Sequence, residues 1–151
     1  GRTTLPGGTQ AFVAAMNRKA QALGMADTPS ADASGLDGAN RSTAEDLVKL
    51  LQAAGRYPLI REATTKSELQ VQPYAGGGAL PYRNTNPLVR SADWRVEVSK
   101  TGYVSEAGHC LAMQAQIAGR RYWIVLLDSA GKRTPVGDSN RLRKWIESAR
   151  G

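Results

Sequence analysis

Three strand patterns follow one another between residues 94 and 128, joined by short connections. In the first, 94–103, apolar residues at even positions alternate with polar residues at odd positions up to Ser99, which is the period of a half-buried strand. The second and third, 108–117 and 121–128, are joined by Ala118-Gly119, a compact hairpin signal. This succession predicts consecutive antiparallel strands rather than parallel strands joined by crossover helices.

Helix patterns come before these strands. Residues 9–23 have apolar side chains at helical spacing, with Thr9 suited to cap the start and Gly24 suited to end the helix. A capping box at residues 42–45 predicts the start of a second helix, which Gly55 would end.

A short helical turn and a final helix complete the predicted elements. The turn runs from Pro58 to about Ala63, because proline suits the first position of a helix. Asp138 is predicted to cap the final helix. That helix is expected to turn four side chains inward: Leu142, Trp145, Ile146 and Ala149. Helices first, then strands, then a covering helix indicate an α+β fold built in layers.

The segments between these elements are predicted as loops, with one exception. Residues 27–41 are rich in Ser, Ala, Asp and Gly, and Leu36 suggests a loop anchored to a core. Residues 68–72 alternate as a strand. Residues 73–81, with three consecutive glycines, indicate a turn, and 82–90 an irregular segment whose asparagines suit loop hydrogen bonds.

The composition is that of a globular domain with a basic surface. The chain has 151 residues, 41% hydrophobic, which is enough to bury a core. A net charge of +7 would attract polyanions such as nucleic acid, anionic lipid or an acidic cell-wall polymer. Because the basic residues are scattered, a solvated basic surface is the simpler interpretation. No apolar run approaches the ~20 residues of a membrane-spanning helix, so no integral membrane span is expected in this chain.

The cysteine and histidine content gives little sign of metal or redox chemistry. Cys110, the single cysteine, cannot form an intrachain disulfide and is predicted to be a small buried hydrophobe. His109, the single histidine, is predicted to have a structural role. No group of His, Cys and carboxylate residues has metal-ligand spacing, so we expect no metal and no cofactor.

Lys100-Thr101-Gly102 is the motif that points to function. If the alternation of the first strand continues, Lys100 lies on the apolar face, where an ammonium group needs a polar partner. Glycine at the next-but-one position would let another backbone approach closely. These residues predict a strand end that holds an anion.

Lys-Thr-Gly also belongs to a known signature. Together with S-x-x-K and S-D-N it marks penicillin-binding proteins and class A β-lactamases. The chain resembles low-molecular-mass penicillin-binding proteins of the D-alanyl-D-alanine endopeptidase or carboxypeptidase type. The resemblance rests on segments that occur in the same order: 12–17, 22–25, 34–36, 40–47, 84–88, 99–103, 106–108, 123–128 and 137–138 with Trp145.

The resemblance implies a β-lactamase/transpeptidase-like fold and a periplasmic serine-type D,D-peptidase. Such an enzyme cleaves peptidoglycan stem peptides or cross-links through an acyl-enzyme and is inhibited by β-lactams. It implies that Lys100 joins the catalytic hydrogen-bond network and that Thr101 binds the substrate carboxylate. It implies further that Gly102 lets the peptide approach and that the Tyr103 backbone N–H is an oxyanion-hole donor.

The chain departs from the signature in its serines. Ser129-Ala-Gly-Lys132 has the S-x-x-K spacing, but it follows Lys-Thr-Gly and lies in a predicted turn. No serine has asparagine two residues later, and Tyr82-Arg-Asn84 lies too near Lys100 to replace that motif. We therefore expect the nucleophile outside this chain and the N-terminal half of the same protein as a partner.

The expected organisation is the C-terminal portion of one catalytic domain. Residues 1–67 would form its helical part, and residues 68–151 its strands and final helix. Two alternatives stay open at this point. The chain could be a non-catalytic fragment that is inert without its N-terminal half. It could also be a basic nucleic-acid-binding module, although it lacks an aromatic stacking platform, and the resemblance itself implies no nucleic acid partner.

Overall fold

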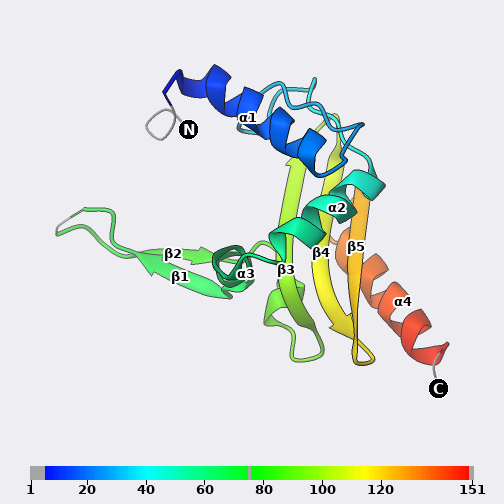
Figure 1. Cartoon of the computed structure of the whole chain (residues 1–151). Helices are drawn as coiled ribbons and strands as arrows, with labels where there is room; N and C mark the ends of the chain where they lie inside the picture. The colour runs from blue at the N-terminus through cyan, green and yellow to red at the C-terminus, as the bar shows by residue number, and fades with distance from the viewer. Residues whose placement is uncertain (1–5, 75, 150–151) are drawn as a thin grey trace.

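The computed structural model describes residues 6–74 and 76–149. It contains helices, two separate antiparallel sheets and a C-terminal helix (Figure 1). The elements in chain order are α1 Gly8–Ala22, α2 Ala44–Ala54, α3 Pro58–Thr65, β1 Glu68–Val71, β2 Leu80–Arg83, the 3-10 helix η1 Pro87–Arg90, β3 Arg95–Val104, β4 Gly108–Ile117, β5 Arg120–Ser129 and α4 Thr134–Ser148.

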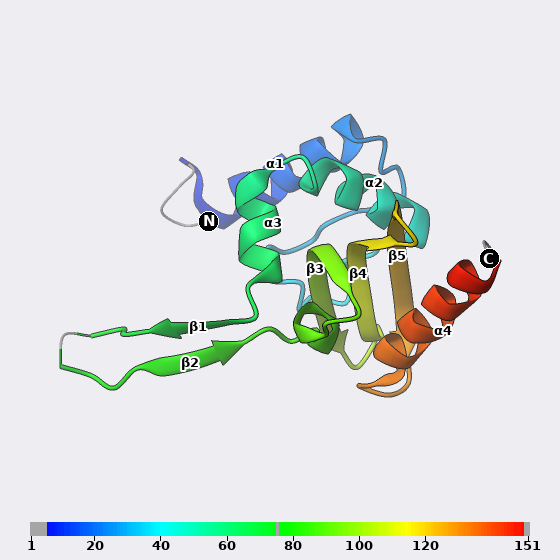
Figure 2. The same ribbon diagram turned by 90° about the horizontal axis from the view of Figure 1, so that it is seen from below.

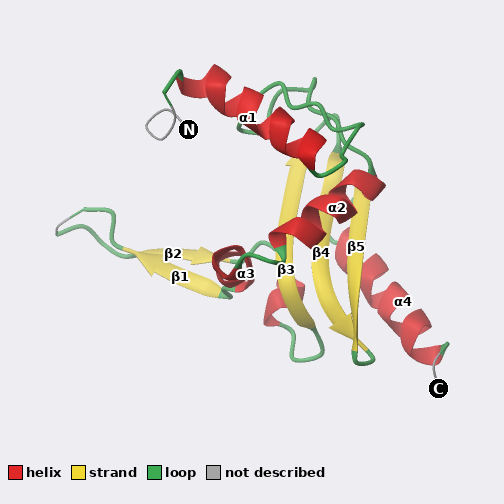
Figure 3. Cartoon of the chain, viewed as in Figure 1, coloured by secondary structure: helices red, strands yellow, loops and turns green. Residues whose placement is uncertain are grey.

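The larger sheet has the strand order β3-β4-β5, and both pairs are antiparallel. Helix α4 covers one face of this sheet, while α2 and α3 pack on the other side (Figures 1 and 2). The secondary-structure colouring of Figure 3 shows that the helices precede and follow the sheet rather than alternate with its strands. The prediction of an α+β fold with consecutive antiparallel strands is confirmed.

The hydrophobic core lies between the sheet and α4. Alternate residues of β4 point into it, because successive side chains of a strand face opposite sides. Burial of each large aliphatic side chain stabilises the fold by roughly 1.5–3 kcal/mol. The buried core residues are Leu88, Trp94, Leu111, Met113, Ala115, Ile117, Ile124 and Ile146.

The opposite face of β4 carries a polar network. Gln114, buried on this face, accepts a hydrogen bond from Trp123 Nε1 at 2.9 Å and donates to Glu97 Oε2 at 2.7 Å. Arg121 donates to the same carboxylate at 2.8 Å. Burial raises the pKa of Glu97, but hydrogen bonds from Arg121, Gln114 and Gln116 outweigh it and lower the pKa overall. The network thus keeps a charged glutamate in β3, on the side of the sheet opposite the core.

The helix boundaries differ from the predictions in their N-terminal caps. Gly7 precedes α1 with no side-chain cap, so Thr9 lies inside the helix. The Thr43 hydroxyl accepts a hydrogen bond from the backbone N–H of Asp46, so the cap of α2 is one residue later than predicted. Helix α4 begins at Thr134, before the predicted cap Asp138, because proline at its second position suits a first turn.

Four apolar side chains predicted to face a core are exposed instead: Leu36, Leu142, Trp145 and Ala149. Leu36 is exposed, and the loop 27–41 is held by polar contacts, including Asn17 with Ser30 at 2.8 Å. Trp145 is 67% exposed on α4, whereas Ile146, the next residue, is buried. The helical stripe predicted for α4 was therefore rotated relative to the face that contacts the sheet.

The smaller sheet is a β1–β2 hairpin that projects away from the rest of the chain (Figures 1 and 2). Strand β1 agrees with the prediction for 68–72, but β2 was predicted as turn and irregular segment. The sequence-based prediction missed β2 because Pro81 lies within it and glycines precede it, and proline within a sheet is confined to strand edges. The pairing aligns Leu69 with Tyr82 and Val71 with Leu80, which gives the hairpin one apolar face.

Candidate functional site

Strand β3, which carries Lys100-Thr101-Gly102, is an edge strand of the larger sheet. The backbone N–H of Ser99 points away from β4 and lies 3.3 Å from Thr64 Oγ1 on α3. In an antiparallel strand both polar groups of a residue point the same way, and the direction alternates along the chain. Since the register is continuous from Val98 to Val104, Thr101 and Tyr103 also direct their backbone groups toward the outer edge.

A β-bulge in β3 changes the predicted environment of Lys100. Val96 pairs with Ala115, but Val98 pairs with Gln114, so Glu97 is the extra residue. The bulge separates Val96 from the face that Val98 and Lys100 share, so the prediction of one continuous apolar face was wrong. The side chain of Lys100 is exposed on the α2 side of the sheet, and its ammonium group donates to the carbonyl of Thr101.

The Thr101 side chain lies on the other face, opposite buried Leu111. Its hydroxyl is 2.6 Å from the hydroxyl of Thr85, in the segment just before η1. The adjacent Asn86 is buried and donates to Ser99 Oγ at 3.0 Å. The segment 84–86 therefore follows this face of β3 and contacts two of its side chains.

Gly102 and Tyr103 complete the exposed end of β3. A Cβ added at Gly102 would have no atom within 4 Å, so the strand is open to an approaching chain there. Tyr103 is 62% exposed and stacks on His109, its cross-strand partner, with ring centroids 4.3 Å apart. Cys110, predicted to be buried, is half-buried, with its thiol 3.2 Å from the carbonyl of Ala107.

The predicted site residues thus lie in a row on one strand edge, and Thr85 joins them from a distant segment. Sequence analysis did not single out Thr85 as a site residue, although Thr85 lies in 84–88, one of the segments on which the resemblance to penicillin-binding proteins rests. Asn84 Nδ2 donates to the backbone carbonyls of Thr64 and Lys66, each at 2.9 Å. These bonds tie the segment to the end of α3.

Ser129 is the last residue of β5 and is buried, and its backbone pairs with His109. The S-x-x-K spacing of Ser129 and Lys132 therefore starts at a strand end rather than on a helix. Within residues 6–74 and 76–149, no group of three or more His, Cys, Asp or Glu residues lies together as a metal site. In the same part of the chain, no helix is long and apolar enough to cross a membrane.

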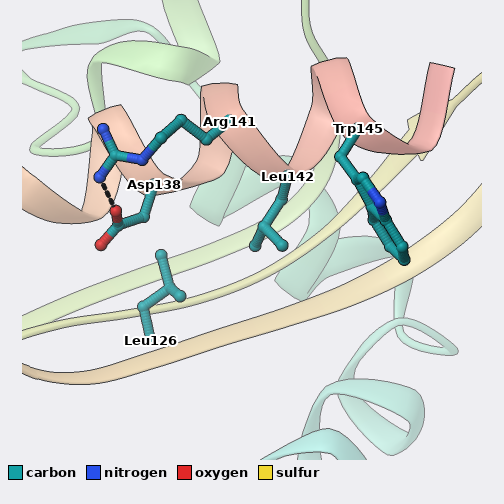
Figure 4. A pocket seen from close by; sticks show the side chains of 5 residues that line it. All are labelled: Leu126, Asp138, Arg141, Leu142 and Trp145. Carbon is teal, nitrogen blue, oxygen red and sulfur yellow. Dashed lines mark hydrogen bonds and ion pairs between the residues drawn. The ribbon is translucent and has the colours of Figure 1, made fainter. Parts of the chain in front are cut away.

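A shallow hollow of about 380 Å³ lies between β5 and α4 (Figure 4). The lining residues are Leu126, Asp138, Arg141, Leu142 and Trp145. Leu126, Leu142 and Trp145 present apolar side chains to it, and Arg141 pairs with Asp138 at one end. Because β4 separates β5 from β3, this hollow is distinct from the outer edge that carries Lys100.

Comparison with known proteins assigns the fold. The chain aligns with the Streptomyces K15 DD-transpeptidase structure with a TM-score of 0.84 and 25% identity, over 95% of this chain and 58% of that one. It aligns with penicillin-binding protein D2 of Listeria monocytogenes, in its cefotaxime-bound form, with a TM-score of 0.74 and 29% identity, over 88% of this chain and 53% of that one. The prediction of a transpeptidase-like fold is confirmed.

Sequence comparison gives the same result. The chain is 43% identical to a D-alanyl-D-alanine endopeptidase of Escherichia coli strain K12, over 96% of this chain and 47% of the relative. It is 44% identical to a D-alanyl-D-alanine endopeptidase of Pseudomonas aeruginosa, over 95% of this chain and 46% of the relative. The chain therefore spans about half the length of these curated relatives. A sequence model of the peptidase S11 family, D-alanyl-D-alanine carboxypeptidase, matches residues 3–131. The chain belongs to the D-alanyl-D-alanine carboxypeptidase family, peptidase S11.

Proposed function

We propose that this chain supplies the substrate-facing strand of a serine-type D,D-peptidase that acts on peptidoglycan peptides through an acyl-enzyme. The proposal rests on the arrangement of residues along the outer edge of β3. Lys100, Thr101, Gly102 and Tyr103 follow one another there, on an edge whose backbone groups have no strand partner within the described residues. Membership in peptidase S11 supports the same reaction.

An extended peptide would pair along this edge. An exposed strand edge binds such a peptide through main-chain hydrogen bonds, and the open space above Gly102 admits it. The Tyr103 N–H, which points outward, would donate to the carbonyl oxygen under attack. One oxyanion-hole donor lowers the barrier by about 3 kcal/mol in serine hydrolases. The second donor would be the N–H of the nucleophilic serine.

The reaction is acyl transfer in two steps. The serine hydroxyl adds to the D-alanyl carbonyl, the C–N bond to the leaving amine breaks, and the amine takes up a proton. Water then cleaves the resulting ester and restores the serine. Lys100 would join the proton-transfer network and contribute positive potential, and Thr101 would bind the carboxylate of the substrate. None of these steps requires a metal or a cofactor.

The relatives support a more specific substrate and location. Two relatives above 40% identity are named D-alanyl-D-alanine endopeptidases, which favours cleavage of cross-links, although carboxypeptidase action on stem peptides uses the same chemistry. The Listeria neighbour binds cefotaxime and ampicillin, so we propose that β-lactams acylate the same serine in this protein. Peptidoglycan lies outside the cytoplasm, and we place the enzyme in the periplasm.

The nucleophilic serine is proposed to lie outside these 151 residues. The chain has no S-x-x-K before Lys100 and no S-x-N, and Ser129 is buried at the end of β5. In this proposal the chain is the C-terminal portion of the catalytic domain, with residues 1–67 as its helical part and 68–151 as its strands and final helix. The chain by itself would be inert.

Replacement of Lys100 tests the proposed role of this strand. In the intact protein, Lys100→Ala should lower the rate of labelling by a fluorescent penicillin by roughly 10²- to 10⁴-fold, because proton transfer contributes that much in related chemistry. Because Lys100 is exposed, the variant should keep its melting temperature. Labelling and thermal melting, measured together, separate a chemical loss from unfolding.

Lys132 provides the matched control. It is the lysine of the S-x-x-K spacing that follows β5, and it is exposed. Lys132→Ala should label at the wild-type rate. Unchanged labelling of Lys100→Ala would remove Lys100 from the mechanism, and an equal loss of labelling in Lys132→Ala would show that the effect is not specific to β3.

A further inference from the structure

We infer that Thr85 is a positioning residue that sets the direction of the Thr101 hydroxyl toward the substrate carboxylate. This inference rests on the proposed function. Thr85 and Thr101 lie in different segments of the chain, yet their hydroxyl oxygens are 2.6 Å apart. That distance is within the range of a strong O–H···O hydrogen bond.

The backbone around Thr85 is fixed on both sides. On one side Asn84 donates to the carbonyls of Thr64 and Lys66, and its own carbonyl accepts from Arg90 at 2.8 Å. On the other side Asn86 is 1% exposed, and its Oδ1 accepts from the N–H of Leu88 at 3.1 Å. Thr85 itself is exposed. Its position beside Thr101 therefore comes from its two neighbours rather than from its own burial.

Asn84 and Asn86 are also joined to each other and to β3. Asn84 Oδ1 accepts from the N–H of Asn86 at 3.0 Å, which closes the turn around Thr85. Asn86 Nδ2 reaches Ser99 Oγ, two residues before Thr101 on the same face of β3. A side chain held in this way loses little conformational freedom when a ligand binds, and preorganisation of this kind strengthens binding.

The two hydroxyls together leave one proton for an anion. Each hydroxyl has one O–H donor, and the shared hydrogen bond uses one of the two. The other O–H remains free to donate to a carboxylate oxygen. A hydroxyl whose oxygen accepts a hydrogen bond becomes a stronger donor, because hydrogen bonds in a chain polarise one another. With Thr85 as the donor of the shared hydrogen bond, its hydroxyl would both orient and strengthen the hydroxyl that Thr101 presents.

The proposed effect of Thr85 on Thr101 depends on hydrogen bonding rather than on charge. Lys100 lies on the other face of β3 and donates to the Thr101 carbonyl, so its ammonium does not contact the hydroxyl pair. A charged carboxylate accepts a hydrogen bond more strongly than a neutral ester. The Thr85 hydroxyl should therefore matter for substrates with a free carboxylate and much less for their esters.

The test compares acylation of the intact protein by benzylpenicillin and by its methyl ester. Thr85→Val removes the hydroxyl and keeps the shape of the side chain, and Thr85→Ser keeps the hydroxyl. For the Val variant we expect the second-order acylation rate constant for benzylpenicillin to fall about tenfold, the value for one hydrogen bond to a charged group. For the Val variant, the acylation rate constant for the methyl ester should stay near the wild-type value. The Ser variant should have wild-type rate constants for both benzylpenicillin and its ester.

Thr85→Ala and a double-mutant cycle complete the test. Because Thr85 is exposed, Thr85→Val and Thr85→Ala should both keep the wild-type melting temperature. The Ala variant, like the Val variant, should be acylated more slowly by benzylpenicillin but not by its ester. In a Thr101→Val background, Thr85→Val should cause no further loss, since the two hydroxyls act together.

The outcomes separate this inference from the proposed function. Equal losses for penicillin and ester would assign Thr85 a merely structural role, and no loss for either would remove it from the site; both results overturn the inference. A wild-type protein that penicillin does not acylate would instead contradict the proposed function itself.

Discussion

Asp46 is a buried carboxylate that joins the loop 27–41 to α2. Its side chain accepts hydrogen bonds from the backbone N–H of Asp27 at 2.9 Å and from the hydroxyl of Thr28 at 2.8 Å. It also pairs with Lys49 at 2.7 Å, and the same ammonium donates to the carbonyl of Gly24. The hydrogen bond from Lys49, with those from Thr28 and Asp27, lowers the pKa of Asp46 despite its burial.

This lowered pKa predicts how stability depends on pH. A carboxyl group with a lower pKa in the folded state stabilises the fold above its unfolded pKa of about 3.9, and this contribution disappears as the pH falls through the folded value. Asp46→Asn should therefore reduce the free energy of unfolding at pH 7. The difference between variant and wild type should shrink as the pH is lowered toward 3. Urea unfolding of both proteins at pH 7 and near pH 3 measures this difference in unfolding free energy. A difference that does not change with pH would contradict a lowered pKa of Asp46 in the folded state.

The end of β5 packs closely against the start of β4. Gly108 has φ +62°, and a Cβ there would lie 2.8 Å from Asp128 Oδ1 and 3.0 Å from Asp128 Cα. Asp128 itself has φ +51°. Gly108 precedes His109, which stacks on Tyr103, so this contact helps to place the exposed end of β3.

Alanine at Gly108 should destabilise the protein through two effects. The left-handed backbone conformation costs about 1–2 kcal/mol for any residue with a Cβ, and the contact with the Asp128 backbone adds to it. Gly119, in the β4–β5 turn, is the control: its φ is +73°, but a Cβ there would have no atom within 4 Å. Gly108→Ala should lose more unfolding free energy than Gly119→Ala in urea titrations. Equal losses would show that the Asp128 contact is unimportant.

The elements that the sequence predicted correctly are those with a clear period and clear ends. Strand β4 has buried apolar residues at every second position from Leu111 to Ile117, and the left-handed Gly24 follows α1 as expected. The bulge at Glu97 had no local signal, because its cause is tertiary: Glu97 turns toward Gln114, Gln116 and Arg121 on neighbouring strands. The alternation of apolar and polar residues along one strand contains no information about hydrogen-bond partners on neighbouring strands.

At the scale of the whole molecule, sequence reasoning proposed site residues on one strand and did not single out the segment that lies beside it. Lys100, Thr101 and Tyr103 adjoin one another in sequence, so a motif could identify them. Thr85 reaches Thr101 only because η1 and the segment before it fold back along β3. Exposure of Trp145 likewise depends on how α4 meets the sheet, which helical spacing alone does not determine.

The arrangement of the whole chain agrees with its being one part of a larger site. The outer edge of β3 presents Lys100, Thr101 and the Tyr103 N–H, while Ser129, which has the S-x-x-K spacing, is buried at the end of β5. The relatives are about twice as long as the chain. We therefore propose that the attacking serine and the substrate-facing strand come from different portions of one protein.

Mapping the serine that penicillin acylates is the decisive experiment for this division of the site. The intact protein and the isolated 151-residue chain would each be treated with a fluorescent penicillin, and the labelled peptide identified by mass spectrometry. We expect a covalent adduct on the intact protein, at a serine of an S-x-x-K segment outside these 151 residues, and none on the isolated chain. An adduct on Ser129, or on any other serine of the isolated chain, would contradict it.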